Sequence, residues 1–352
     1  MERRNSRRVK VGNIYIGGGE KITVQSMLNR PASDIEGSIA QAVELEKAGC
    51  EIIRAAVPDM AAVKLIEKLK ENLTVPVVAD IHFDYRLALA SLDAGVDKIR
   101  INPGNIGSFD RVKAVADACR QKNVPIRIGV NAGSLEKEIL AEYGSPCAEA
   151  LVKSALKHTE LLEKCDFNDI IISIKSSTVK TMVESYELMA QKCDYPLHLG
   201  VTEAGTHNMA LIKSSIGIGS LLLKGIGDTI RVSMTDDPVK EVIAANDILK
   251  SIGIKTDCPD IVSCPTSGRT KIDLIGLANE VEARLRDCKK PIKVAVMGCA
   301  VNGPGEAREA DIGIACGADN AAMFKKGVKI KTYQGNFVEE FIKDIKICAE
   351  EL

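Results

Sequence analysis

Short β-branched runs alternate with amphipathic segments of helical period between residue 22 and about residue 235. There are eight such runs, and they begin at Ile22, Glu51, Pro76, Lys98, Pro125, Asp169, Pro196 and Asp228. Several of the helical segments finish at or next to a glycine, a common cap before a chain re-enters a sheet. Eight β/α units in series fit a closed parallel barrel better than a doubly wound open sheet. The pattern therefore predicts an α/β fold, with a (β/α)8 TIM barrel over residues 1–250.

A different pattern begins near residue 250, where the chain becomes rich in Cys, Gly and Pro. Strand-like runs follow at 261–274, 293–298 and 311–316, and helical segments are expected over 276–288 and from residue 336. This order predicts a second, small α/β domain over residues 251–352.

Composition narrows the class of protein. A chain of 352 residues with 45% hydrophobic residues can fill two cores, and its net charge of −1 is spread along the sequence, which favours neither nucleic acid nor a membrane surface as partner. No apolar segment follows the basic N-terminus and none approaches the roughly 18 residues of a spanning helix, so we expect a cytoplasmic protein. The 11 cysteines are then expected as reduced thiols, either buried or bound to metal.

Five cations interrupt apolar strands at or near their C-terminal ends, and they are Arg54, Arg100, Arg127, Lys175 and Arg231. Any one of them could be a barrel ion pair or a side chain that reaches the rim. Five at equivalent positions would repel one another unless an anion lay between them, and ligands of this fold bind at the C-terminal face. The spacing therefore predicts a phosphate or diphosphate site, because the arginine fork matches phosphate oxygens.

The same strand ends carry further polar residues, which we take as candidate substrate-binding groups: Asp80, His82, Asn102, Asn131, Ser176, His198, Glu203 and Ser233. Most are hydrogen-bonding groups suited to hydroxyls or phosphate oxygens. Glu203 is a carboxylate among cations and could donate or accept a proton. His82 and His198 are equally well explained as structural histidines.

Two cysteines of the second domain lie in turn-rich loops. Cys264 is part of S-C-P-T-S-G-R-T, and Cys299 is part of G-C-A-V-N-G-P-G-E, which also contains Glu306. Thiolates favour iron–sulfur or zinc centres. The spacing alone is a weak signal, because Ser267 occupies the position that would complete a C-x-x-C pair.

Taken in order, the motifs resemble the 4-hydroxy-3-methylbut-2-enyl diphosphate synthase family over nearly the whole chain. They are V-Q-S-M, A-D-I-H-F, R-I-N-P-G-N-I-G, R-I-G-V-N-A-G-S-L, G-V-T-E-A-G and M-G-C-A-V-N-G-P-G-E. The resemblance implies reductive ring opening and dehydration of 2-C-methyl-D-erythritol 2,4-cyclodiphosphate in isoprenoid biosynthesis. It also implies electrons from ferredoxin or flavodoxin, a [4Fe-4S] cluster, and a homodimer in which the cluster domain of one subunit closes over the barrel of the other.

The resemblance further implies roles for individual residues. The five cations would clamp the diphosphate with Asn102, Asn131 and Ser233, while Asp80 and His82 would line the pocket and Glu203 would be the acid/base residue. Three cysteines and one glutamate hold the cluster in the family, and these positions map to Cys264, Ser267, Cys299 and Glu306.

Ser267 departs from the family pattern, because serine stands where the second cysteine is expected. A hydroxyl is a harder donor than a thiolate, so we expect a labile cluster and slow turnover. Cys258 or Cys316 could supply a thiolate, although a structural role is the simpler explanation for each. Two other interpretations remain: a pterin-binding type of barrel enzyme, and a zinc-stabilised or cluster-free binding protein in which Cys264, Cys299 and Glu306 form a structural site.

Overall fold

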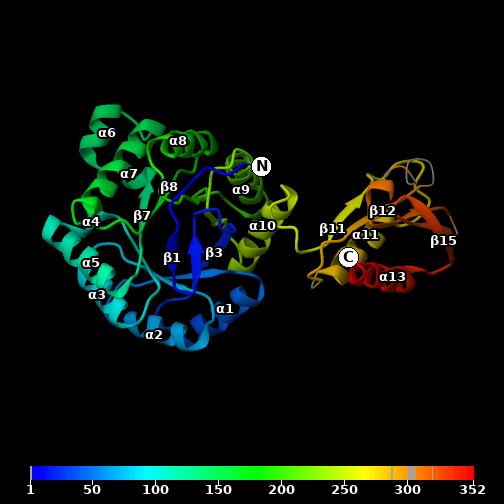
Figure 1. Ribbon diagram of the computed structural model, residues 1–352, viewed down its shortest axis with the longest axis horizontal. Coiled ribbons are helices and arrows are strands. Elements are labelled where there is room, and N and C mark those ends of the chain that lie inside the picture. Colours follow the sequence, from blue (N-terminus) through cyan, green and yellow to red (C-terminus); the bar gives the residue numbers. More distant parts are fainter. Residues whose placement is uncertain (1, 287, 300–304, 306, 319) are drawn as a thin grey trace. The chain divides into compact units, whose positions relative to one another are not determined.

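The chain divides into two compact units, Met1–Ile252 and Gly253–Leu352. The structure is a computed structural model that describes residues 2–286, 288–299, 305, 307–318 and 320–352. The first unit is built on an eight-stranded parallel sheet and the second on a five-stranded sheet (Figure 1). None of the helices in these ranges is long and apolar enough to cross a membrane.

The first unit is a (β/α)8 barrel, as predicted. Its strands follow one another in the order β8-β7-β6-β5-β4-β3-β10-β9, and a parallel bridge from Ile172 to Leu197 joins β8 to the segment before β9. Each of the eight predicted runs contains one strand: β3 (Thr23–Met27), β4 (Ile52–Ala56), β5 (Val77–Asp80), β6 (Lys98–Ile101), β7 (Ile126–Asn131), β8 (Ile170–Lys175), β9 (His198–Leu199) and β10 (Thr229–Ile230).

Helices surround this barrel (Figure 1). Aspartates begin several of them; for example, Asp34 accepts a hydrogen bond from the backbone N–H of Gly37 at 3.0 Å. Gly49 follows the first helix with φ of +95°, a conformation that favours glycine and turns the chain toward the next strand. The helices are α1 (Ile35–Lys47), α2 (Val63–Asn72), α3 (Tyr85–Asp93), α4 (Pro103–Ile106), α5 (Phe109–Lys122), α6 (Lys137–Tyr143), α7 (Ala148–Glu163), α8 (Val179–Lys192), α9 (His207–Leu223) and α10 (Pro238–Ser251).

An antiparallel hairpin, β1 (Val9–Val11) and β2 (Ile14–Ile16), closes one end of the barrel. Its apolar side chains form one buried cluster with Ile52, Val78 and Ile171, which lie near the starts of their strands. The sequence pattern does not predict this hairpin, because each strand has only three residues. With the N-terminal end filled, the C-terminal strand ends remain for a ligand.

The second unit packs two helices, α11 (Leu274–Leu285) and α13 (Val338–Glu350), on one mixed sheet. Its strands are β11 (Asp260–Ser263), β12 (Lys293–Met297), β13 (Ile312–Cys316), β14 (Asn320–Lys325) and β15 (Val328–Gln334). The first three are parallel, and the last two are antiparallel additions that the sequence analysis missed.

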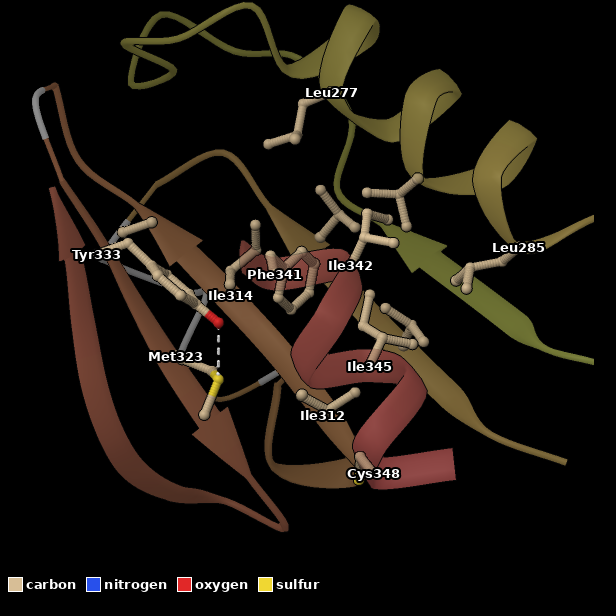
Figure 2. Close-up of a cluster of buried hydrophobic side chains, with 14 of the residues drawn as sticks. Leu277, Leu285, Ile312, Ile314, Met323, Tyr333, Phe341, Ile342, Ile345 and Cys348 are labelled. Atoms are coloured by element: carbon tan, nitrogen blue, oxygen red, sulfur yellow. Dashed lines mark hydrogen bonds between the residues drawn. The ribbon is translucent and has the colours of Figure 1, made fainter. Parts of the chain in front are cut away.

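Figure 2 shows the core between the helices and this sheet. Phe341, Ile342 and Ile345 of α13 project from the helix into the same cluster as Ile312 and Ile314 of β13. The Tyr333 hydroxyl lies 2.9 Å from the Met323 sulfur and donates to the Asp344 carboxylate at 2.5 Å. The core is therefore apolar, and the Tyr333 hydroxyl at its edge has a hydrogen-bond acceptor in Asp344.

Candidate anion site and candidate iron–sulfur ligands

Four of the five predicted cationic side chains are buried inside the barrel. Arg54, Arg100, Arg127 and Lys175 are each 8% exposed or less, and they come from β4, β6, β7 and β8. Alternate residues of a strand share a face, so Arg54 faces the barrel interior, as does Ile52 of the buried cluster beneath the β1–β2 hairpin. Arg100 and Arg127 are direct neighbours across the β6–β7 pair. The fold thus brings together cations that are far apart in the sequence.

Asp80 of β5 is the carboxylate at the centre of this group. Its oxygens lie 3.1 Å from Arg100 Nη1, 3.8 Å from Arg54 Nε and 3.4 Å from His82 Nε2. Burial alone would raise the pKa of Asp80, but Arg54, His82 and Arg100 together hold it well below its usual range. Asp80 therefore stays ionised and neutralises part of the cationic charge.

Other cations of the group are left without an opposite charge. Arg127 Nε and Nη2 are buried with no hydrogen-bond partner, and neither Arg127 nor Lys175 has a carboxylate within ion-pair distance in the described ranges. Burial and then the neighbouring cations lower the pKa of both side chains. Arg54 is less affected, and its pKa is lowered to about 10 by burial, partly offset by Asp80. The guanidinium groups still remain charged, because arginine is so strong a base.

Arg231 follows β10 and completes the five predicted cations. Its Nη2 lies 3.4 Å from Glu241 Oε2, and the same carboxylate accepts from Ser26 and from the backbone N–H of Met234. After burial, the charge of Arg231 lowers the pKa of Lys175, and it also contributes to lowering the pKa of Arg54, so the three side chains share one electrostatic environment. Five cations thus face two buried carboxylates, Asp80 and Glu241, and the excess positive charge fits a ligand with several negative charges.

Gly129 makes room for one of these arginines. A Cβ on Gly129 would lie 2.5 Å from Arg100 Nε, and Arg100 Nη2 points to the Gly129 carbonyl oxygen at 3.4 Å. Any larger residue at this position would displace the Arg100 guanidinium. The glycine therefore sets where that guanidinium lies.

The neutral candidates follow the same strand ends, with varied surroundings. Asn102 Oδ1 accepts from the Gly104 N–H at 3.1 Å and caps α4, whereas Ser176 Oγ accepts from the Thr178 N–H. Asn131 ends β7, and Ser233 is half-buried after β10. His198 is fully buried, and neither ring nitrogen has a partner among the described residues. Burial, followed by Arg127 and Lys175, lowers its pKa.

Glu203 lies in the loop after β9 and is exposed. Its φ is +51°, a left-handed conformation that is costly for a non-glycine residue. The loop is held on both sides: the Thr202 N–H donates to the Ser176 carbonyl at 3.2 Å, and the Thr235 N–H donates to the Gly205 carbonyl at 3.0 Å. Glu203 is therefore presented between the loops that follow β8 and β10, at the edge that carries the cations.

Two buried residues of the barrel were missed by the sequence analysis, Lys98 and Glu241. Lys98 is 0% exposed and lies two residues before Arg100 on the same strand face. The period-two pattern of that run was sufficient to find it. Glu241 lies in the first turn of α10, and nothing local in the sequence indicates that it reaches Arg231.

In the second unit, Cys264 and Cys299 follow the neighbouring parallel strands β11 and β12. The backbone N–H of Gly298 donates to Cys264 Sγ at 3.2 Å, a contact that stabilises a sulfur carrying negative charge. Ser267 is exposed in the same turn as Cys264, and its Oγ accepts from the Arg269 N–H at 3.3 Å. Glu306 lies outside the described residues.

These donors fit an iron–sulfur cluster in which the Ser267 hydroxyl oxygen takes the place of a cysteine sulfur that would bind iron more strongly. Two thiols and an N–H···S contact are typical of cluster loops, and the Ser267 hydroxyl is the harder third donor. Within the described ranges no three His, Cys, Asp or Glu side chains already converge as metal ligands. Cys316 is close to Cys264, but it is 1% exposed and burial raises its pKa to about 12, which favours a structural thiol.

Both units match one protein family. The model of the GcpE TIM-barrel domain matches residues 6–246, and that of the GcpE protein C-terminal domain matches residues 260–347. A Clostridium perfringens protein described as 4-hydroxy-3-methylbut-2-en-1-yl diphosphate synthase (flavodoxin) is 58% identical over 98% of this chain and 99% of its own length. A Fusobacterium nucleatum protein of the same description is 55% identical over 97% of each chain.

Solved structures that resemble the chain match about the length of the barrel. A Geobacillus kaustophilus 3-dehydroquinate dehydratase has a TM-score of 0.53 at 14% identity and covers 72% of this chain and 100% of its own. Dihydropteroate synthase from Stenotrophomonas maltophilia has a TM-score of 0.52 at 15% identity, covering 70% of this chain and 97% of its own. At such identities these similarities show the barrel fold alone.

Proposed function

Because the chain belongs to the GcpE family over both of its units, we propose that it is the enzyme that converts 2-C-methyl-D-erythritol 2,4-cyclodiphosphate to 4-hydroxy-3-methylbut-2-enyl diphosphate. The observation that carries the proposal is the excess of buried cations over carboxylates at the strand ends of the barrel. A cyclic diphosphate supplies the missing negative charge. A neutral pterin ligand would leave Arg127 and Lys175 unneutralised.

The barrel residues then have distinct tasks. Arg127 and Lys175, which have no carboxylate partner in the described ranges, bind the diphosphate oxygens, while Asp80 orients Arg54 and Arg100 through its ion pairs with them. Asn102, Asn131, Ser176 and Ser233 lie at the same strand ends and contact the remaining oxygens, whereas His198, the first residue of β9, lies deeper. Bidentate arginine contacts fix the ligand's orientation as well as its affinity.

Glu203 is the proposed acid/base residue. Water leaves during the reaction, so a hydroxyl must be protonated, and a carboxyl group at the rim can deliver that proton. The left-handed conformation of Glu203 supports a functional role, because strain of this kind is kept where a side chain must be aimed. The loop's hydrogen bonds with Ser176 and Thr235 hold that aim.

Cys264, Ser267, Cys299 and Glu306 are the proposed ligands of a [4Fe-4S] cluster, which would pass two electrons, one at a time, from the external reductant to the substrate. Flavodoxin is the proposed reductant, as in the descriptions of the relatives. We also propose that the enzyme acts as a homodimer. Because Ser267 replaces a thiolate, cluster assembly is expected to limit turnover.

The test combines ligand binding with turnover in anaerobically reconstituted protein. We expect the cyclodiphosphate to bind to the full chain, and we expect product after addition of reduced flavodoxin, with more product from Ser267→Cys than from the parent. Glu203→Gln should bind the ligand with little change but lose most turnover. If the cyclodiphosphate does not bind to either chain, the proposed function is wrong; if it binds and neither chain forms product, the ligand is right and the reaction is not.

A further inference from the structure

Lys98 lies deeper in the barrel than the residues that the proposed function uses. It is 0% exposed, and it shares a strand face with Arg100. Its Nζ lies 3.5 Å from Gln25 Oε1, the limit of a hydrogen bond. No carboxylate of the described ranges lies within ion-pair distance of its amine. An ammonium group at this position would be buried without a counter-charge.

The charged groups around Lys98 increase this cost. Burial lowers the pKa of Lys98 most, followed by Arg127 of β7 and Arg54 of β4, and only Asp97 acts in the opposite direction. The Asp97 carboxylate is already occupied, since it accepts from Lys70 Nζ at 2.6 Å and from the Val77 N–H at 2.8 Å. With no anion bound, these surroundings favour the neutral amine.

His198 of β9 is the other titratable group of this inner layer. Neither of its nitrogens has a hydrogen-bond partner in the part of the chain that the structure describes, and its pKa is lowered by burial and then by cations that include Lys98. Asp80 of β5 is engaged by Arg54 and Arg100, and Lys175 of β8 lies nearer the strand ends. Lys98 and His198 are thus two neutral bases among the arginines, in a site that gains negative charge when a ligand arrives. Lys175, whose pKa burial and then Arg231 also lower, lies at the strand ends, where it contacts that ligand directly.

We propose that binding of a diphosphate against Arg54 and Arg127 is coupled to uptake of one proton by the Lys98 amine. The proton comes from the solvent, a new N–H bond forms on Lys98, and no electron moves. The added negative charge favours the ammonium form, which in turn balances the ligand charge from below. Lys98 does not contact the ligand, so it is a positioning residue. The inference rests on the proposed function only in taking the diphosphate as the physiological anion.

The experiment is isothermal titration of the full chain with the cyclodiphosphate at about pH 8, in buffers of different ionisation enthalpy. The ligand's own phosphate groups are fully ionised there and exchange no proton. For the parent chain we expect the observed binding enthalpy to vary linearly with the ionisation enthalpy of the buffer, with a slope near one proton taken up. We also expect Kd to increase by up to about 10-fold per pH unit as the pH rises. Lys98→Met should abolish both dependences.

Three further titrations assign the proton. Lys68→Met, a substitution of a half-exposed lysine paired with Glu71, should keep the parent slope. His198→Gln should also keep it, whereas loss of the slope in this variant alone would overturn the assignment to Lys98. If methionine is not tolerated at position 98, as judged by circular dichroism, Lys98→Gln takes its place.

Sulfate separates this inference from the proposed function, because it is a dianion that exchanges no proton near pH 8. Proton uptake with sulfate, without any binding of the cyclodiphosphate, would support the role of Lys98 and reject the proposed substrate. Binding of either anion to the parent chain with a slope of zero would overturn the role of Lys98. So would an unchanged slope in the Lys98→Met protein.

Discussion

Replacing Arg127 by methionine should stabilise the free protein and weaken its ligand binding. Arg127 is 1% exposed, two of its nitrogens lack partners, and Arg54 and Arg100 are the charges that most oppose it. Exchange of buried charges for apolar side chains has stabilised other proteins by about 1–4 kcal/mol. Methionine is shorter, so part of the gain is lost to the space it leaves. We expect a net gain of about 1–3 kcal/mol in the free energy of unfolding.

The loss of affinity follows from the same side chain. A guanidinium that gives two charge-assisted hydrogen bonds to a phosphate contributes about 3 kcal/mol to the binding free energy. Loss of this contribution in Arg127→Met corresponds to about a 150-fold increase in Kd. Ligand at about 100 times the parent Kd stabilises the parent by about 2.7 kcal/mol. The same concentration should stabilise the Arg127→Met protein by only about 0.3 kcal/mol. Ligand therefore shifts the difference in stability by about 2.4 kcal/mol in favour of the parent.

Calorimetric unfolding with and without the cyclodiphosphate measures both effects. The chain has no tryptophan, so circular dichroism is the suitable second probe. Arg86→Met is the matched control, because Arg86 is exposed and paired with Asp84; it should change neither stability nor affinity measurably. A free Arg127→Met protein that is several kcal/mol less stable than the parent would refute the reasoning. It would mean that Arg127 stabilises the free protein, and is not an unneutralised charge held for ligand binding.

Three further changes have separate expected outcomes. Asp80→Asn removes the carboxylate between Arg54 and Arg100 and should destabilise the protein by about 3–5 kcal/mol in urea denaturation. The pKa of Asp80 is lower in the folded state, so its contribution to the free energy of unfolding is fully present above about pH 3.9 and is lost as the pH falls below that value. The Asp80→Asn protein should therefore lose less stability than the parent between about pH 5 and pH 2; an equal loss in both proteins would mean that the ion pairs are weaker than inferred. Gly129→Ala should weaken ligand binding about 10-fold, or about 1.4 kcal/mol, by displacing Arg100, and an unchanged Kd would show that the guanidinium can move aside freely. Ser267→Cys should raise bound iron and sulfide severalfold after anaerobic reconstitution, and equal content in both proteins would remove Ser267 as the cause of a labile cluster.

The eight barrel strands were predictable because each is an apolar run bounded by turn residues and followed by a helical pattern. Even β9, with two ladder residues, could be found from the run beginning at Pro196. The β1–β2 and β14–β15 hairpins were missed for different reasons. The first has strands too short to show a period, and the outer strand of the second is mostly exposed, so its alternation is not that of a buried strand.

The site was only partly predictable, because sequence gives the face of a residue more readily than its partner. The position of Arg100 near a strand end indicated an inward cation, but its pairing with Asp80 and the space provided by Gly129 depend on neighbouring strands. Lys98 was overlooked although it shares the Arg100 face. Glu241 could not be assigned, since its contact with Arg231 bridges a strand end and a helix.

The departure at Ser267 and the charge of the barrel are separable properties. The cations and carboxylates of the anion site lie between residues 54 and 241, whereas the candidate iron ligands lie between residues 264 and 306. The unneutralised charge of Arg127 belongs to the first unit, which contains none of the candidate iron ligands. Substitution at Ser267 should therefore alter electron delivery and leave the barrel's own anion contacts intact. Low turnover of this chain would, for that reason, say little about its substrate, which is better identified by what the barrel binds.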